Sequence, residues 1–269
     1  MYCKELNKDF DTKKEMISAL KANKTLIIKQ KKSDIKTKDN KLGELRGISF
    51  KSTEKADDGM IYPVISNTNY LDSHNDVHLN GSMSKTAKEQ NGKVYYVADH
   101  KLEVDSIIAT PKNVNIKLES VKFGEIGLES DKNTECLVFE INREDILHEK
   151  ALKLIDNKEP LQNSIRMQYV KLDLAVNDSS DGYEDEFKVW SEVYPKLANP
   201  EKADELGYFW AVRELKIVNE GSMVLFGSND MTPIKDSSDA DESHHDKNEP
   251  DDSTQSVTDM LQKVKFNFK

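Results

Sequence analysis

Few side chains in this sequence have types and positions that could do chemistry. A histidine, His100, ends the run that begins at Val94, and a serine, Ser164, opens an alternating run that continues to Tyr169. A histidine can act as a general base, whereas a serine hydroxyl reacts only after a base removes its proton. No base stands near Ser164 in sequence, so any base must come from elsewhere in the fold.

The alternation of apolar and polar residues predicts how these two side chains are presented. Ile165 and Met167 take the apolar face of one strand, which places Ser164 on the polar face, outside the core. In the earlier strand Asp99 and His100 point to opposite sides, so Asp99 is a poor partner for the histidine.

The sequence shows no convincing ligand set for a metal ion and no phosphate-binding loop. His74 and His78 are four residues apart but lie among turn formers, and no third ligand is dictated. We therefore expect no metal and no cofactor. Cys3 and Cys136 are far apart, and Cys136 lies in an apolar run, which predicts a buried reduced thiol and a reducing, cytoplasmic setting.

Residues 1–46 form a basic N-terminal segment for which a helix is predicted from about Asp11 to about Lys36. Thr12 and Glu15 have the spacing of a capping box at its start. We expect its lysine-rich face to be a solvated surface rather than a binding patch.

Residues 47–234 have the pattern of a folded domain with short strands broken by Gly, Asn, Asp and Pro. Its composition favours an α+β fold, a β-barrel or strongly curved sheet flanked by helices. The strands are expected at Lys93 to Ala98, Ser106 to Ala109, Glu135 to Ile141, Ser164 to Val176 and Glu214 to Val218, and the helices at Arg143 to Asp156 and Glu186 to Tyr194.

The rest of the chain is an acidic stretch over 235–256, expected to be a disordered linker, and an apolar peptide over 257–269, expected to dock onto a partner. The net charge of −10 gives no general attraction to nucleic acid or to anionic membranes. No stretch approaches the roughly 18 to 20 apolar residues of a membrane span, so we expect no nucleic-acid or membrane partner.

Four blocks, read in order, carry a resemblance to a known family. They are Tyr70 to Val77, Val94 to His100 followed by Ile107 to Ala109, Gln162 to Ile165, and Leu215 to Val224. In this order they resemble the tailed-phage prohead proteases, whose barrel is shared with the herpesvirus assemblins. The resemblance covers roughly residues 47–234.

The resemblance implies a serine protease with Ser164 as nucleophile, His100 as general base and Glu220 as the acid that orients the histidine. Glu214 is an alternative acid and His74 an alternative base. The family commonly has Gly after Ser164 and Ile165, where this chain has Arg166; that side chain could donate to the oxyanion or obstruct the groove. The Gly that the family usually has after the histidine block is also replaced, near Ile108 and Ala109.

The family's setting implies an enzyme packaged in an assembling procapsid within the host cytoplasm. Its substrates would be the scaffold, the major capsid protein and often the protease itself. Self-association of the chain is a further expectation. The alternatives are a catalytically silent scaffolding or assembly protein on the same barrel and, more distantly, an unrelated ligand-binding barrel. If the chain is the protease, its lysine-rich N-terminal segment would be a propeptide that is removed by self-cleavage.

Overall fold

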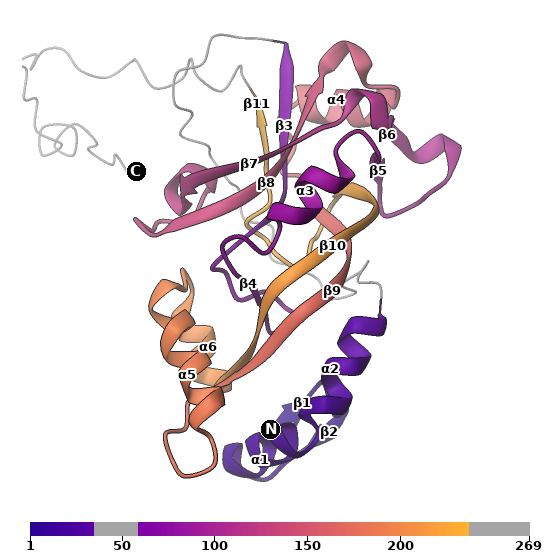
Figure 1. Cartoon of the computed structure of the whole chain (residues 1–269). Coiled ribbons are helices and arrows are strands. Elements are labelled where there is room, and N and C mark those ends of the chain that lie inside the picture. The colour runs from indigo at the N-terminus through magenta and orange to yellow at the C-terminus, as the bar shows by residue number, and fades with distance from the viewer. Residues whose placement is uncertain (35–58, 237–269) are drawn as a thin grey trace, which may run out of the picture.

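The fold is built around one long antiparallel hairpin, made of β9 (Gln162–Val176) and β10 (Tyr208–Val224). The structure is a computed structural model, which describes residues 1–34 and 59–236 (Figure 1). Along β9, Ile165, Met167 and Tyr169 are buried at every second position, which confirms the predicted alternation.

β10 is the central strand of a five-stranded sheet. β9 lies along one side of it, while on the other side β4 (Asp76–His78) and β5 (Tyr95–Ala98) pair in parallel with its first and last parts. β6 (Ile107–Ala109) pairs with β5 in antiparallel fashion. The expected β5 and β6 are confirmed, but β10 is much longer than expected, because it is buried along most of its length and does not alternate.

A second, four-stranded antiparallel sheet packs against the first. Its strands, in spatial order, are β11 (Ile234–Asp236), β3 (Met60–Asn67), β8 (Asn133–Asn142) and β7 (Asn115–Lys122). The two sheets share one apolar core, in which Phe139 of β8 meets Tyr96 of β5 edge to face at 6.1 Å between ring centroids. Burying each such ring contributes about 1.5–3 kcal/mol.

The α+β class is confirmed, but the closed barrel is not found in residues 1–34 and 59–236. Closure requires that every strand have two neighbours. β6, β7, β9 and β11 each pair with a single strand, so both sheets stay open. Curvature comes instead from irregularities in the pairing of β10 with β9, where the register shifts.

The N-terminal segment forms a small hairpin and two helices rather than one helix. The elements are β1 (Tyr2–Cys3), β2 (Lys8–Asp9), α1 (Lys13–Ala22) and α2 (Lys24–Ser33). The capping box at Thr12 and Glu15 is confirmed, whereas Asn23 ends α1 by bonding back to Ala19 and so breaks the predicted helix.

Helix α2 packs along β9, and α1 and α2 add Met16, Leu20 and Ile27 to the central core. The expectation of a solvated lysine face is wrong at two places. Lys31 is buried against Asp76, and Lys24 bonds the buried Glu186 at 2.6 Å. The lysines therefore hold the segment to the rest of the fold.

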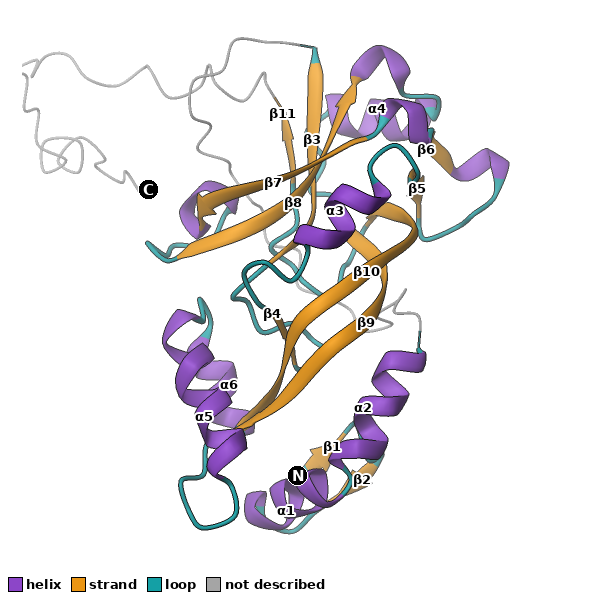
Figure 2. Cartoon of the chain, in the orientation of Figure 1, coloured by secondary structure: helices purple, strands orange, loops and turns teal. Residues whose placement is uncertain are grey.

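Four further helices complete the fold: α3 (Ser84–Gln90), α4 (Glu149–Asp156), α5 (Glu184–Val193) and α6 (Pro200–Leu206). α4 and α5 correspond to the two predicted helices. Figure 2 shows α1 and α2 on one side of the lower part of the hairpin and α5 and α6 on the other. The expected linker does not begin at 235, because Lys235 and Asp236 pair with β3 as part of β11. The rest of the expected linker and the docking peptide, residues 237–269, lie outside the described residues. No helix in the described part of the chain has the length and apolar character needed to cross a bilayer.

Candidate active site

His100 lies in a strained turn directly after β5. The strand ends at Ala98, and Asp99 and His100 both have left-handed backbones, with φ values of 53° and 57°. Such conformations cost non-glycine residues roughly 1–3 kcal/mol each and concentrate at functional sites. The backbone N–H of Asp99 bonds the carbonyl of Met223 at 2.9 Å, so the turn is tied to β10.

Glu220 contacts the histidine across 120 residues of sequence. Its Oε1 lies 2.8 Å from Nδ1 of His100, and its carboxylate is fully buried. A bulge in β10 places it there: between the pairs of Ile217 and Gly221, Asn219 takes a left-handed backbone with φ of 68°. Asn tolerates this conformation better than most residues.

Ser222 joins the acid to the backbone of the histidine. Its hydroxyl donates to Oε2 of Glu220 at 2.7 Å and accepts from the backbone N–H of His100 at 3.0 Å. The intervening Gly221 faces the other way, where a Cβ would lie 2.7 Å from Phe139 and 2.9 Å from Ile65. Glycine therefore lets β10 sit close enough to β8 and β3 to present both polar side chains.

Ser164 lies on β9 directly opposite Ser222. Directly opposed residues of an antiparallel pair project from the same face, with Cβ atoms about 4.5–5.5 Å apart. Ser164 is half-buried, and its hydroxyl makes no hydrogen bond with any other described residue. The half-buried Ser164 is thus the neighbour of Ser222 on the adjacent strand, and Ser222 in turn contacts Glu220 and His100.

The residue before the serine fixes the start of β9. The side-chain oxygen of Asn163 accepts from the hydroxyl of Tyr96 at 2.7 Å, and its amide donates to the carbonyl of Thr232 at 2.9 Å. The backbone N–H of Asn163 also bonds that carbonyl, at 2.7 Å. These bonds hold the register of Ser164 against β10.

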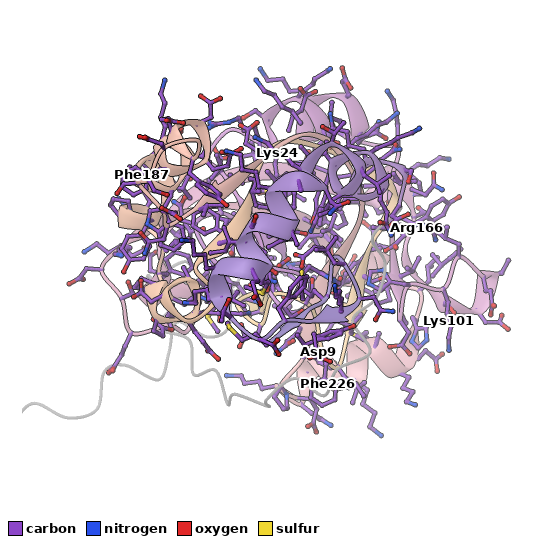
Figure 3. The ribbon with its side chains drawn as sticks, turned by 90° about the horizontal axis from the view of Figure 1, so that it is seen from below. Asp9, Lys24, Lys101, Arg166, Phe187 and Phe226 are labelled. Carbon is purple, nitrogen blue, oxygen red and sulfur yellow. The ribbon has the colours of Figure 1, made fainter. Side chains whose placement is uncertain are left out.

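Arg166 projects from the same face of β9 as Ser164. Its Nε is buried and has no hydrogen-bond partner among the described residues. Figure 3 shows Arg166 at the edge of the molecule, on the same side as Lys101, the residue after His100. A buried donor without a partner costs about 1–3 kcal/mol, so an oxygen acceptor that reached Nε of Arg166 would relieve this cost.

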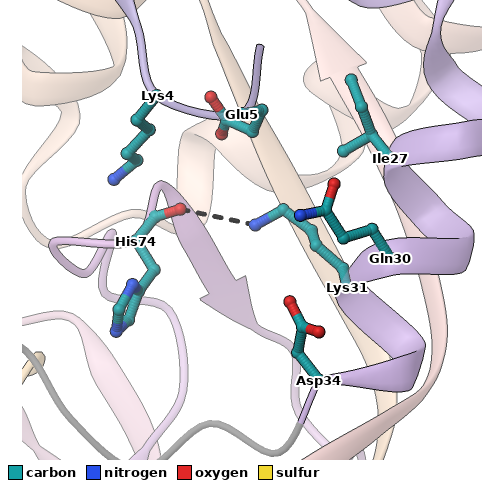
Figure 4. A pocket seen from close by; sticks show the side chains of 7 residues that line it. All are labelled: Lys4, Glu5, Ile27, Gln30, Lys31, Asp34 and His74. Carbon is teal, nitrogen blue, oxygen red and sulfur yellow. Dashed lines mark hydrogen bonds between the residues drawn. The ribbon is translucent and has the colours of Figure 1, made fainter. Parts of the chain in front are cut away.

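The two alternative residues lie apart from this cluster. Glu214 bonds the exposed Lys85 at 3.1 Å, so of the two acids it is Glu220 that contacts His100. His74 accepts from Lys31 Nζ through its backbone carbonyl at 3.5 Å and borders a pocket of about 180 Å³ (Figure 4). That pocket is lined by Lys4, Glu5, Ile27, Gln30, Lys31, Asp34 and His74.

A second serine and histidine pair, which sequence reasoning did not find, is buried below the first part of β10. Ser66 Oγ lies 3.0 Å from Nδ1 of His78. Both residues are buried, and burial lowers the pKa of His78. The pair lacks access to a polypeptide substrate, which makes it structural. No sequence pattern indicates that these two residues are in contact, since Ser66 lies in β3 and His78 in β4.

Two buried carboxylates, those of Asp72 and Asp76, interact electrostatically with His78 of that pair. Burial and the charge of Asp76 raise the pKa of Asp72. Burial alone would raise the pKa of Asp76 too, but the ammonium of Lys31 at 2.6 Å and the hydroxyl of Tyr169 at 2.7 Å hold it below its ordinary value. The block from Tyr70 to Val77 thus contains a buried ionic centre that anchors helix α2 through Lys31.

Within residues 1–34 and 59–236, no group of three or more His, Cys, Asp and Glu side chains is placed to hold a metal ion. Cys3 and Cys136 are both free and buried, as predicted for Cys136. Comparisons of the chain with protein-family models, with curated proteins and with solved structures found no match.

Proposed function

We propose that the chain is a serine endopeptidase of the prohead protease type. The observation that carries the proposal is the 2.8 Å contact between His100 Nδ1 and the buried Glu220, with the half-buried Ser164 opposite the serine that touches both. Serine hydrolases use a histidine oriented by a buried acid to activate a serine hydroxyl. Ser164 supports the comparison because strand pairing places it opposite Ser222, which bonds both Glu220 and the backbone of His100.

In the proposed reaction, Glu220 accepts a hydrogen bond from the Nδ1–H of His100, which keeps the proton on Nδ1 and leaves Nε2 free to act as a base. Nε2 removes the proton of the Ser164 hydroxyl as Oγ attacks the carbonyl carbon of a peptide bond. The same proton then passes from Nε2 to the leaving amine, and an acyl-enzyme remains. Water, deprotonated by His100, releases the acid product and restores Ser164.

We further propose that Arg166 donates to the oxygen that becomes negative in the tetrahedral intermediate. Its buried, partnerless Nε and its position on the face of Ser164 support this role. A preorganised donor of this kind contributes about 100- to 1,000-fold to the rate in serine proteases. On this proposal the two open sheets correspond to the barrel of the family, with Arg166 filling the place of its usual Gly.

The proposed substrates are the scaffold, the major capsid protein and the chain itself, cut inside an assembling procapsid in the host cytoplasm. Residues 237–269 would tether the enzyme to capsid or scaffold subunits and so raise its local concentration. Self-association remains part of the proposal.

The test is the intact mass of the purified protein over time, with and without the capsid protein. We expect wild type and the exposed control Ser179→Ala to shorten or to cut the capsid protein, and Ser164→Ala and His100→Ala to leave both whole. If wild type leaves both proteins whole, the enzyme proposal is wrong and a silent assembly protein takes its place.

A further inference from the structure

Ser222 makes contacts that set it apart from the serine opposite. Its hydroxyl has one proton, and that proton points to Oε2 of Glu220, because the other neighbour, the backbone N–H of His100, can only donate. The side chain is also fully buried. Ser222 is therefore unsuited to attack a substrate, whereas Ser164 has a partly accessible hydroxyl that is not engaged with any described residue.

Both oxygens of the Glu220 carboxylate have a partner because of Ser222. Oε1 meets the imidazole of His100 at 2.8 Å and Oε2 meets the Ser222 hydroxyl at 2.7 Å. A fully buried carboxylate oxygen without a donor is costly, so losing Ser222 would favour another side-chain rotamer for Glu220. The second bond thereby holds Oε1 toward Nδ1.

The same hydroxyl also supports the strained backbone of the histidine. His100 has a φ of 57°, and its N–H donates to Ser222 Oγ at 3.0 Å. One side chain thus fixes the acid and the base relative to each other. We propose that Ser222 is a positioning residue that couples the carboxylate of Glu220 to the backbone of His100 and so maintains the geometry in which Ser164 is activated.

This inference rests on the proposed function, and a fluorophosphonate probe tests the two separately. The probe needs no known substrate: Ser164 Oγ forms a bond to phosphorus, fluoride leaves, and His100 takes the proton. We expect wild type to be labelled at Ser164. We expect Ser222→Ala to lower the maximal labelling rate about 10- to 100-fold, the range for losing hydrogen bonds to a charged group, with the half-saturating probe concentration unchanged.

Two controls isolate the hydroxyl. Ser82→Ala removes another buried serine hydroxyl, one without a partner among the described residues, and should label at the wild-type rate. Ser222→Thr and Ser222→Val have side chains of nearly equal volume, and only Thr keeps the hydroxyl. We expect the Thr variant to label at least ten times faster than the Val variant. This pair decides the question even if Ser222→Ala fails to fold.

A second readout follows the backbone. The amide of His100 should exchange slowly with deuterium in wild type and faster in Ser222→Val, with Ser222→Thr close to wild type. Equal labelling and equal exchange in the Thr and Val variants would overturn the role of Ser222 while leaving a labelled Ser164 intact. Probe found on Ser222 would overturn it as well. A wild type without label refutes the proposed function instead, and the exchange result then still decides whether Ser222 holds His100.

Discussion

The buried ion pair between Lys31 and Asp76 gives the sharpest stability prediction. The two charged atoms are 2.6 Å apart, and the side chains are 8% and 0% exposed. Changing Lys31 to Met removes the ammonium, keeps an unbranched apolar side chain of similar length and leaves the carboxylate buried. Breaking a buried pair in this way destabilises proteins by about 3–5 kcal/mol. For a chain of this size we therefore expect the melting temperature to fall by roughly 6–20 °C.

The measurement is urea unfolding followed by circular dichroism, on wild type, Lys31→Met, Lys31→Met/Asp76→Asn and the control Lys29→Met. Lys29 is exposed on the same helix, so its replacement should change the free energy of unfolding by less than about 0.5 kcal/mol. The double variant should recover at least half of the loss, because no uncompensated charge remains. If Lys31→Met loses less than about 1 kcal/mol, or if the double variant is as unstable as the single one, the reasoning about a buried anchor is refuted.

The same pair predicts a pH dependence. Lys31 and Tyr169 hold the pKa of Asp76 below its ordinary value, so the folded chain binds this proton more weakly than the unfolded chain. The resulting stabilisation is present above about pH 4, where an unfolded Asp is ionised, and is lost as the pH falls through the folded pKa. Lys31→Met lacks this contribution. The difference in unfolding free energy between wild type and the variant should therefore shrink as the pH is lowered.

Three more predictions concern the hairpin. Gly221→Ala places a Cβ 2.7 Å from Phe139 and should lower the unfolding free energy, measured in urea, by about 1–3 kcal/mol; an unchanged value would refute the close packing of β10. Glu220→Gln should slow fluorophosphonate labelling of Ser164 while Glu214→Gln leaves it unchanged, and the reverse result would assign the acid to Glu214. Asn163→Ala leaves the buried hydroxyl of Tyr96 without its acceptor and should cost about 1–3 kcal/mol, measured in the same way, with unchanged stability arguing against its part in fixing β9.

Local signals explain what could be predicted from the sequence. The capping box at Thr12, the alternation through Ile165 and Met167 and the burial of Cys136 each depend on side chains within a few positions of one another. Patterns of this kind predict helix starts, strand faces and core residues. They also predicted that Asp99 would not orient His100, and Asp99 is exposed, although the reason is a left-handed turn rather than a continued strand.

Long-range contacts explain what could not be predicted. The sequence predicts a short strand from Glu214 to Val218, because Asn and Gly residues usually interrupt strands. In the structure β10 continues through Asn219 and Gly221 by a bulge and a close packing contact. The buried position of Lys31 depends on Asp76, and the role of Ser222 depends on His100, 122 residues away. Open sheets instead of a barrel likewise depend on which strands pair, and no single strand specifies that.

Some residues of the candidate site are positioned by left-handed backbone and others by regular strand pairing. His100 and the Glu220 bulge depend on left-handed residues, a conformation that costs non-glycine residues roughly 1–3 kcal/mol. Asn7, Asn69, Asn75 and Lys158 have it elsewhere in the fold, so here the strain explains how the two side chains are brought together and does not by itself mark a site. Ser164 needs no strain, since plain antiparallel pairing sets it opposite Ser222. It needs the correct register instead, because a slip of one residue would turn it to the other face. The bonds of Asn163 to Tyr96 and Thr232 prevent that slip at the residue before it, which is where a functional requirement on register would place them.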